Sequence, residues 1–227
     1  GGTFVSITNL LDEARSNKEI KKVVFNPYGL NPEGQQSGPD KEDLRTVKFD
    51  ETSKSWVMPF VMEIINSRIV RRSHALSGFP YGKNFKYGEA FITGKGITGR
   101  IKASAGLVGL GLLLIGKQDS LYQKLVNKLL PSPGEGPSQK EREEGFYKIL
   151  FYGINDGNIR IKAEVIGDRD PGYGSTSKML GESAVCLAKD DTKGCMTSGV
   201  LTPSLAMGDK IIKRLELNAG LSFEITQ

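Results

Sequence analysis

The residues from 158 to 189 constrain the fold more than any other part of the chain. Apolar and charged residues alternate from Ile159 to Val165, which predicts a strand with one buried face. A charged, glycine-rich turn follows at 167–174. Ser175 can then cap a helix that continues to the end of this stretch, with apolar residues on one stripe.

Such a strand, turn and helix N-terminus together present backbone N–H groups that can meet an anionic ligand. Gly181 lies inside the predicted helix, where glycine costs roughly 1 kcal/mol against alanine, and this indicates close packing at that point. The glycines of the turn can equally serve only to let the chain reverse and the helix lie against a sheet. The structural and the ligand-contacting interpretations both stay open.

Hydrophobic periodicity elsewhere predicts helices separated by short strands. The helices are expected at about 3–25, 59–73, 117–130 and 203–219. Strands are expected at 146–154 and 221–225, and the first should pair antiparallel with the strand at 158–165 through an Asp-Gly turn. Residues 26–55 form an irregular segment, which either folds over the surface or contributes to a site. The order of elements predicts an α+β fold, with a mixed, largely antiparallel sheet and helices packed on it.

Composition excludes several classes of protein. Hydrophobic residues make up 38% of the 227 and charged residues 25%, which is typical of a globular chain. The net charge of +5 permits an anionic ligand or a membrane surface, but it is far below the dense basic patch of a nucleic-acid binder. Cys186 and Cys195 do not form a disulfide framework, and we expect a reduced, cytoplasmic protein. A single histidine, His74, expected at the surface or at a helix cap, leaves no ordinary zinc site.

Two apolar or glycine-rich segments need separate treatment. The most apolar run, 105–115, is too short to cross a bilayer, which takes about 20 residues, so a buried helix is expected. Peripheral membrane contact stays open because Lys102 and Lys117 lie close by. Gly94 to Gly99 match the GxGxxG pattern, but that pattern indicates a dinucleotide site only inside a βαβ unit, and the second strand is missing here.

Three arginines crowd the C-terminal half of the helix expected at 59–73. Arg68, Arg71 and Arg72 can simply be favourable cations near a helix C-terminus, each worth about 0.3–1 kcal/mol when exposed. Alternatively, they form a clamp for a phosphate or carboxylate.

Four separated blocks of sequence resemble a known family. They are NSRIVRRS at 66–73, PGEGPS at 133–138, DRDPGYGST with KMLGE at 168–182, and GVLTP with MGD at 199–209. Together, and in this order, they resemble the saccharopine dehydrogenase-like oxidoreductases, including the trans-acting enoyl reductase group. The resemblance covers nearly the whole chain.

The resemblance implies an NAD(P)-dependent oxidoreductase whose Rossmann domain is not in this chain. Family members place that domain, with a GATGxTG-like glycine turn, ahead of the part seen here, and the motif does not occur in these residues. A missing N-terminal domain of about 150 residues would hold NAD(P). Residues 1–227 would then be a single C-terminal substrate and dimerisation domain, which has no bound cofactor of its own and is inactive alone.

The site that follows from these expectations combines the arginines with the glycine-rich turn. Its partners would be a small-molecule substrate, the missing Rossmann domain and a second copy in a homodimer. Arg68, Arg71 and Arg72 would clamp an anionic group, and Tyr173 is the candidate proton donor. The turn residues that would face the substrate are Asp168, Arg169, Asp170, Ser175 and Thr176. The alternative function is a non-catalytic module for dimerisation or peripheral membrane attachment.

Overall fold

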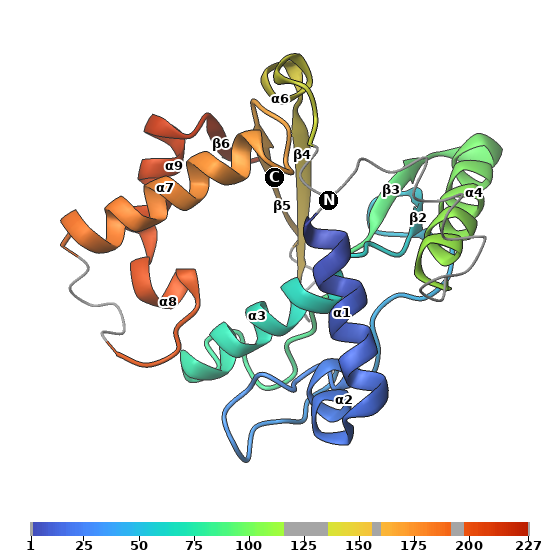
Figure 1. Cartoon of the computed structure of the whole chain (residues 1–227), viewed down its shortest axis with the longest axis horizontal. Helices are drawn as coiled ribbons and strands as arrows, with labels where there is room; N and C mark the ends of the chain where they lie inside the picture. Colours follow the sequence, from blue (N-terminus) through green and yellow to red (C-terminus); the bar gives the residue numbers. More distant parts are fainter. Residues whose placement is uncertain (1, 116–135, 156–159, 192–197, 227) are drawn as a thin grey trace. The chain divides into compact units, whose positions relative to one another are not determined.

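The computed structural model describes residues 2–115, 136–155, 160–191 and 198–226 (Figure 1). The chain divides into two compact units, Gly1–Glu135 and Gly136–Gln227. Within the described residues each unit contains a three-stranded antiparallel sheet. The predicted α+β class is therefore confirmed, with two small sheets where the sequence predicts one.

The first unit begins with two helices, not with the single helix predicted at 3–25. Helix α1 covers Gly2–Ser16 and α2 covers Lys18–Phe25. Asn17 separates them in an extended conformation, and its side chain accepts hydrogen bonds from the backbone N–H groups of Glu19 and Ile20. An asparagine that caps a new helix in this way competes with continuation of the old one.

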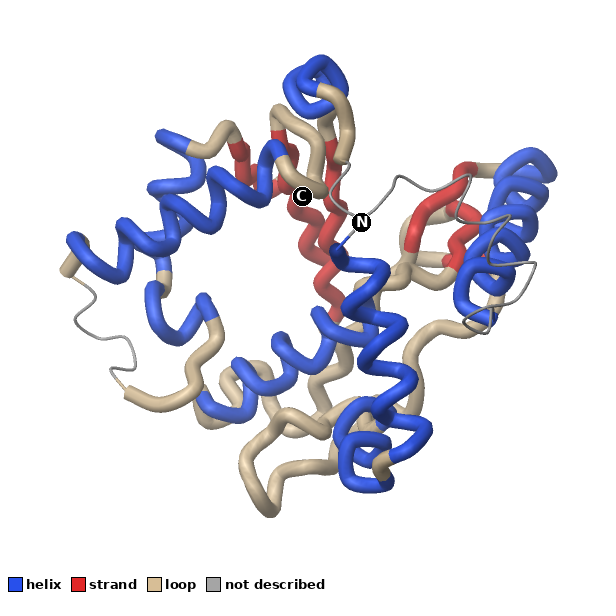
Figure 2. The backbone as a smooth tube through the Cα atoms, viewed as in Figure 1, coloured by secondary structure: helices blue, strands red, loops and turns tan. Residues whose placement is uncertain are grey.

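The first sheet has the order β1-β2-β3, with the strands Lys48–Asp50, Ser55–Met58 and Phe91–Gly94. Helix α4, Gly96–Ile115, follows β3 directly and packs on β2 and β3 (Figure 2). The strand and helix around the GxGxxG pattern therefore exist. However, β3 pairs antiparallel with β2, so this part of the chain does not form the βαβ unit of a dinucleotide site.

Helix α4 differs from the buried helix predicted at 105–115. Several of its large apolar side chains are exposed, among them Val108 and Leu112. No helix among the described residues is both long and apolar enough to cross a membrane. The helix predicted at 117–130 lies outside the described residues.

Helix α3 covers Glu63–Leu76 and begins four residues later than the helix predicted from Pro59. Residues 61 and 62 form a turn instead, in which the N–H of Glu63 donates to the carbonyl of Phe60. Met62 occupies the N-cap position without a side-chain hydrogen bond. The helix therefore starts without the capping side chain that sequence patterns rely on.

In the second unit, α6 (Gln139–Glu144) precedes the sheet β4-β5-β6. Strands β4 (Tyr147–Ile154) and β5 (Arg160–Gly167) pair antiparallel along their whole length. This confirms the predicted hairpin, although residues 156–159 of its turn lie outside the described part. Strand β6 (Leu221–Ile225) pairs antiparallel with β5, also as predicted.

Three helices accompany this sheet: α7 (Gly174–Lys189), α8 (Pro203–Met207) and α9 (Asp209–Asn218). The helix predicted at 203–219 is therefore two, and they are separated at Gly208, whose φ of 53° is unfavourable for other residues. The close packing predicted at Gly181 is wrong for the part of the chain that the structure describes, where a Cβ built on Gly181 would meet nothing within 4 Å.

The face that α7 buries also differs from the prediction. Ser175 does not cap the helix but lies in its first turn, completely buried, and Cys186 is completely buried further along the same face. Leu180 and Leu187, which belong to the apolar stripe predicted for this helix, are exposed.

Candidate functional site

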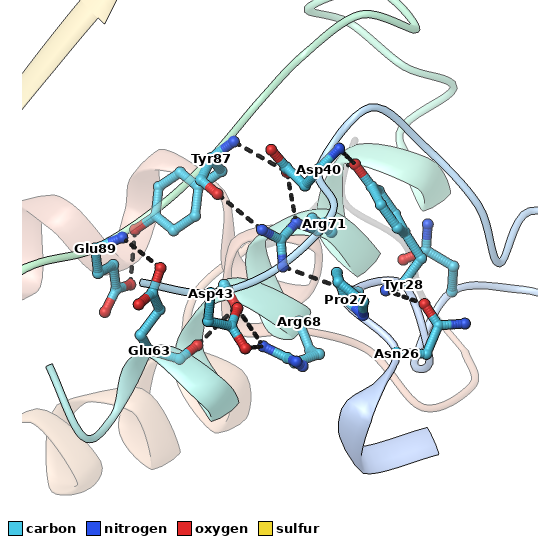
Figure 3. A network of polar contacts seen from close by, with 12 residues as sticks. Asn26, Pro27, Tyr28, Asp40, Asp43, Glu63, Arg68, Arg71, Tyr87 and Glu89 are labelled. Atoms are coloured by element: carbon cyan, nitrogen blue, oxygen red, sulfur yellow. Dashed lines mark hydrogen bonds and ion pairs between the residues drawn. The ribbon is translucent and has the colours of Figure 1, made fainter. Parts of the chain in front are cut away.

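The strongest concentration of buried charge in the first unit lies on α3. Its buried residues are Glu63, Ser67, Arg68, Arg71, His74 and Ala75. The polar members recur at helical spacing, so one polar stripe of this helix faces inward. Figure 3 shows the network that this stripe forms with residues from 26–43 and 87–89.

Arg71 lies at the centre of the network, with its side chain only 3% exposed. Its Nε is 2.8 Å from Oδ2 of Asp40, and its two Nη atoms donate to the carbonyls of Pro27 (3.2 Å) and Tyr87 (2.8 Å). The guanidinium also lies over the Tyr28 ring, 5.3 Å from the centroid. One side chain therefore fastens two loops, near 27–40 and near 87, to α3.

Arg68 makes a second link of the same kind. Its Nη1 is 2.7 Å from the Asp43 carboxylate and 3.0 Å from Oγ of Ser67, while Nη2 donates to the carbonyl of Val24 at 3.3 Å. Arg72 is less buried, and its Nη1 donates to the carbonyl of Leu30. All three arginines therefore bond to groups of this chain.

Glu63 holds the other end of the network and is 4% exposed. Burial raises the pKa of its carboxyl group, although the backbone N–H groups of Glu89 (3.0 Å) and Leu44 (3.2 Å) favour its ionised form. The Glu89 carboxylate in turn accepts hydrogen bonds from the Tyr87 hydroxyl (2.8 Å) and from Asn66 (2.9 Å). Burial, together with the neighbouring Glu89, raises the pKa of Tyr87.

His74 completes the inward stripe and is buried, contrary to the surface position predicted for it. Its ring stacks on Tyr81 and touches Phe79 and Phe85, with centroid distances between 4.6 and 5.5 Å. Its Nε2 lies 3.0 Å from the carbonyl of Gly82. The aromatic residues after α3 therefore pack around this histidine.

This geometry bears directly on the predicted anion clamp. Arg68 and Arg71 are almost fully buried and already neutralise Asp43 and Asp40. An external anion would have to displace those carboxylates, which are held by further hydrogen bonds. The network is therefore suited to fixing the irregular segment 26–47 on α3, and the binding of a substrate anion by these arginines stays a prediction.

The glycine-rich turn of the second unit is organised by Asp170. Its carboxylate accepts hydrogen bonds from the backbone N–H groups of Gly172 (2.9 Å), Tyr173 (3.2 Å) and Gly174. Partial burial opposes ionisation, but these N–H groups outweigh it and hold the pKa of Asp170 below its usual value. The chain's own carboxylate therefore occupies the N–H groups that were expected to meet an anionic ligand.

The other predicted turn residues have different environments. The Oγ of Ser175 lies 2.9 Å from the Tyr147 hydroxyl, and Thr176 donates to the carbonyl of Pro171 at 2.6 Å. The Asp168 carboxylate lies against Gly220, where a Cβ would come within 2.2 Å of it. The Nε of Arg169 is buried without a partner among the described residues.

Tyr173 occupies the N-cap position of α7 and is 46% exposed. The turn also exposes Gly172 and Thr176, so it is not enclosed in the core of its unit. The arginines belong to the first unit and the turn to the second.

The network residues that the sequence analysis missed are Asp40, Asp43, Glu63, Tyr87 and Glu89. One signal for them exists: polar residues recur at positions 63, 67, 71 and 74, which is the spacing of a buried stripe. Among the described residues no group of three or more His, Cys, Asp or Glu side chains could hold a metal ion.

Comparisons with known proteins identify relatives but no family model and no solved structure, since neither kind of search gives a match. A Mycobacterium tuberculosis protein, provisionally named a trans-acting enoyl reductase, is 35% identical over 239 residues, which cover 100% of this chain and 56% of that protein. A second M. tuberculosis protein, named trans-acting enoyl reductase, is 34% identical over 227 residues. A Mycobacterium ulcerans protein of the same name is 35% identical over 224 residues.

These two proteins each match 95% of the chain and 53% of their own length. The chain thus spans about half the length of the curated relatives it matches. The similarity supports the enoyl reductase part of the resemblance. The saccharopine dehydrogenase link and the missing Rossmann domain stay predictions.

Proposed function

We propose that this chain is part of an NAD(P)-dependent, enoyl reductase-like oxidoreductase and that it shapes the substrate side of the active site. The proposal is carried by sequence similarity. The chain matches trans-acting enoyl reductases over 95–100% of its own residues, and these matches cover about half the length of each relative. Relatives of nearly twice the length leave room for a nucleotide-binding domain outside these residues.

The GxGxxG segment of the first unit does not have the setting of a dinucleotide-binding turn. Gly94 and Gly96 have positive φ, and Gly99 lies against the Gly94 carbonyl, so the GxGxxG turn is tight. However, β3 belongs to an antiparallel sheet and does not begin a βαβ unit. The proposal therefore assigns the cofactor to the rest of the protein.

Reduction of an enoyl group also needs a proton donor, and the half-exposed phenol of Tyr173 is our candidate.

The experiment compares two proteins: a full-length protein that contains this chain, and the 227-residue chain alone. Oxidation of NADH or NADPH is followed with an α,β-unsaturated thioester as substrate. We expect turnover by the full-length protein and none by the chain alone. Turnover of NAD(P)H by the chain alone, or a full-length protein that oxidises neither cofactor with such substrates, would contradict the proposal.

Tyr173→Phe in the full-length protein tests the proton donor. General acid catalysis typically contributes 10²- to 10⁴-fold, so kcat should fall by at least about 100-fold while KM changes little. Tyr152→Phe is the matched control, because Tyr152 is also a partly exposed tyrosine of the second unit and lies on β4. Equal activity of both variants would remove Tyr173 from the mechanism and leave the enzyme class untouched.

A second candidate function is a dimerisation module. It is favoured by the exposed leucines of the second unit, Leu180 and Leu187 on α7 and Leu217 on α9. The molecular mass of the chain in solution, measured by light scattering, tests it. A dimer that Leu180→Glu converts to a monomer would support this function, and a wild-type monomer would refute it.

A further inference from the structure

Three small residues of helix α4, Gly99, Ala103 and Gly106, face the sheet, and four of its large apolar residues face outward. Ala103 is completely buried, and Gly106 lies so close to β2 that a Cβ there would come within 2.4 Å of the Met58 sulfur. Gly99, on the same side, lies against the backbone of Gly94. A helix that packs through glycine and alanine gains little apolar burial on its inner face.

The outward residues form one continuous stripe. Ile97, Ile101, Val108 and Leu112 are between 50% and 79% exposed, and we call them the outer stripe. At about 100° per residue, these four positions fall within about 60° of one another around the helix axis. Four large apolar side chains along one line of a helix are costly to expose to water, so this face is suited to an apolar surrounding.

The charges around the outer stripe have one sign. From residue 90 to residue 115 the sequence contains no acidic residue but three cations, Lys95, Arg100 and Lys102. Arg100 and Lys102 are exposed. Around the helix axis, Arg100 lies about 90° from the centre of the stripe on one side, and Lys102 lies about 110° from it on the other. The apolar line is therefore bordered by a cation on each side.

We propose that this face of α4 binds the surface of a bilayer that contains anionic lipids. The helix would lie in the plane of the interface, with the outer stripe among the upper acyl chains and with Arg100 and Lys102 extended to lipid phosphates. A second copy fits this face less well. Two α4 helices packed stripe to stripe would bring cations together without an acidic residue on either helix to pair with them.

The test is sedimentation of the full chain with phosphatidylcholine vesicles, with and without about a third of phosphatidylserine. We expect binding to the anionic vesicles and at least tenfold weaker binding to the neutral ones. Increased salt should abolish part of the binding to the anionic vesicles. Lys102→Gln should weaken binding about fivefold, since one basic residue near such a surface is worth about that factor. Ile101→Glu with Val108→Glu should weaken it by at least 100-fold.

Ile225→Glu is the matched control, because Ile225 is an exposed isoleucine of the other unit and belongs to neither proposed binding surface. It should bind as the wild type does. The fold of each variant is checked by its melting temperature, and exposed positions should leave this unchanged. Trp56, the only tryptophan, gives a second readout, since Arg100 lies over its ring at 5.2 Å and its fluorescence should shift on binding.

Three results would overturn the proposal. The chain could stay in the supernatant with every vesicle, or it could bind while the outer-stripe variant binds equally well. In the third, the wild-type chain would be a dimer without lipid and the outer-stripe variant would be a monomer. That result would identify a second copy as the partner that covers this face. None of these results bears on the proposed oxidoreductase function, because that function does not depend on α4.

Discussion

Replacement of Arg71 with methionine tests whether the buried network holds the first unit together. Methionine keeps much of the length of the side chain but removes the charge and all its donors. It leaves the Asp40 carboxylate, whose side chain is only 11% exposed, without its cation, and the carbonyls of Pro27 and Tyr87 without a donor. The loss therefore includes an uncompensated buried charge as well as several hydrogen bonds.

Loss of one partner of a buried ion pair typically costs about 3–5 kcal/mol. The whole free energy of unfolding of a domain is about 5–15 kcal/mol, so Arg71→Met should remove about a fifth of it or more. Arg45→Met is the matched control. Arg45 pairs with Glu42 at 3.2 Å, but the two side chains are 72% and 61% exposed, and such pairs contribute less than about 1 kcal/mol.

The assay is urea unfolding of the chain followed by the fluorescence of Trp56, which lies in the first unit and therefore reports on that unit. We also expect Asp40→Asn to cost at least about 1 kcal/mol less in the Arg71→Met background than in the wild type, because the two residues interact directly. The reasoning is refuted if Arg71→Met and Arg45→Met have the same free energy of unfolding within 1 kcal/mol.

Further predictions concern the second unit. Tyr147→Phe removes the 2.9 Å hydrogen bond between the Tyr147 hydroxyl and the completely buried Ser175, and it should lower the free energy of unfolding by about 1–2 kcal/mol, measured by urea unfolding against Tyr152→Phe. Gly167→Ala should destabilise this unit more strongly, since the new Cβ would come within 2.2 Å of the Tyr147 ring; an unchanged melting temperature would contradict this. Asp170→Asn should cost about 1 kcal/mol at neutral pH, because backbone N–H groups bond more strongly to a charged carboxylate than to a neutral amide. Because the pKa of Asp170 is lower in the folded than in the unfolded state, its contribution is present above about pH 4 and is lost as pH falls through the folded-state pKa. The melting temperature should therefore fall less between neutral and acid pH in Asp170→Asn than in the wild type.

The parts of the fold that were predictable are those set by local pattern. The antiparallel pairing of β4 and β5 follows from two runs joined by Asp156-Gly157. The alternation of residue types within each run predicts a strand without reference to distant parts of the chain. The start of α8 at Pro203 is local in the same sense, because proline suits the first turn of a helix. In such elements the residues that determine the structure are neighbours in the sequence.

The parts that were not predictable depend on distant partners. The sequence indicates that Arg68 and Arg71 are surface cations or an anion clamp. It does not reveal their carboxylate partners, because these lie 25 and 31 residues earlier in the chain. The apolar residues of α3 suggested an apolar inner face, whereas the most buried face is polar. Periodicity identifies a face that differs from the rest of the helix, but it does not identify which face is inside when the inner partners are charged.

The same reasoning limits where a substrate anion can be bound. The two anion-binding groups that the sequence predicts, the α3 arginines and the N–H groups before α7, both hold carboxylates of the chain itself. Displacing them would sacrifice the contacts that position Tyr87 and Tyr173. If the protein reduces an enoyl substrate as proposed, the Asp170 carboxylate fixes the turn that presents Tyr173, and the exposed phenol of Tyr173 is our candidate for the group that acts on the substrate.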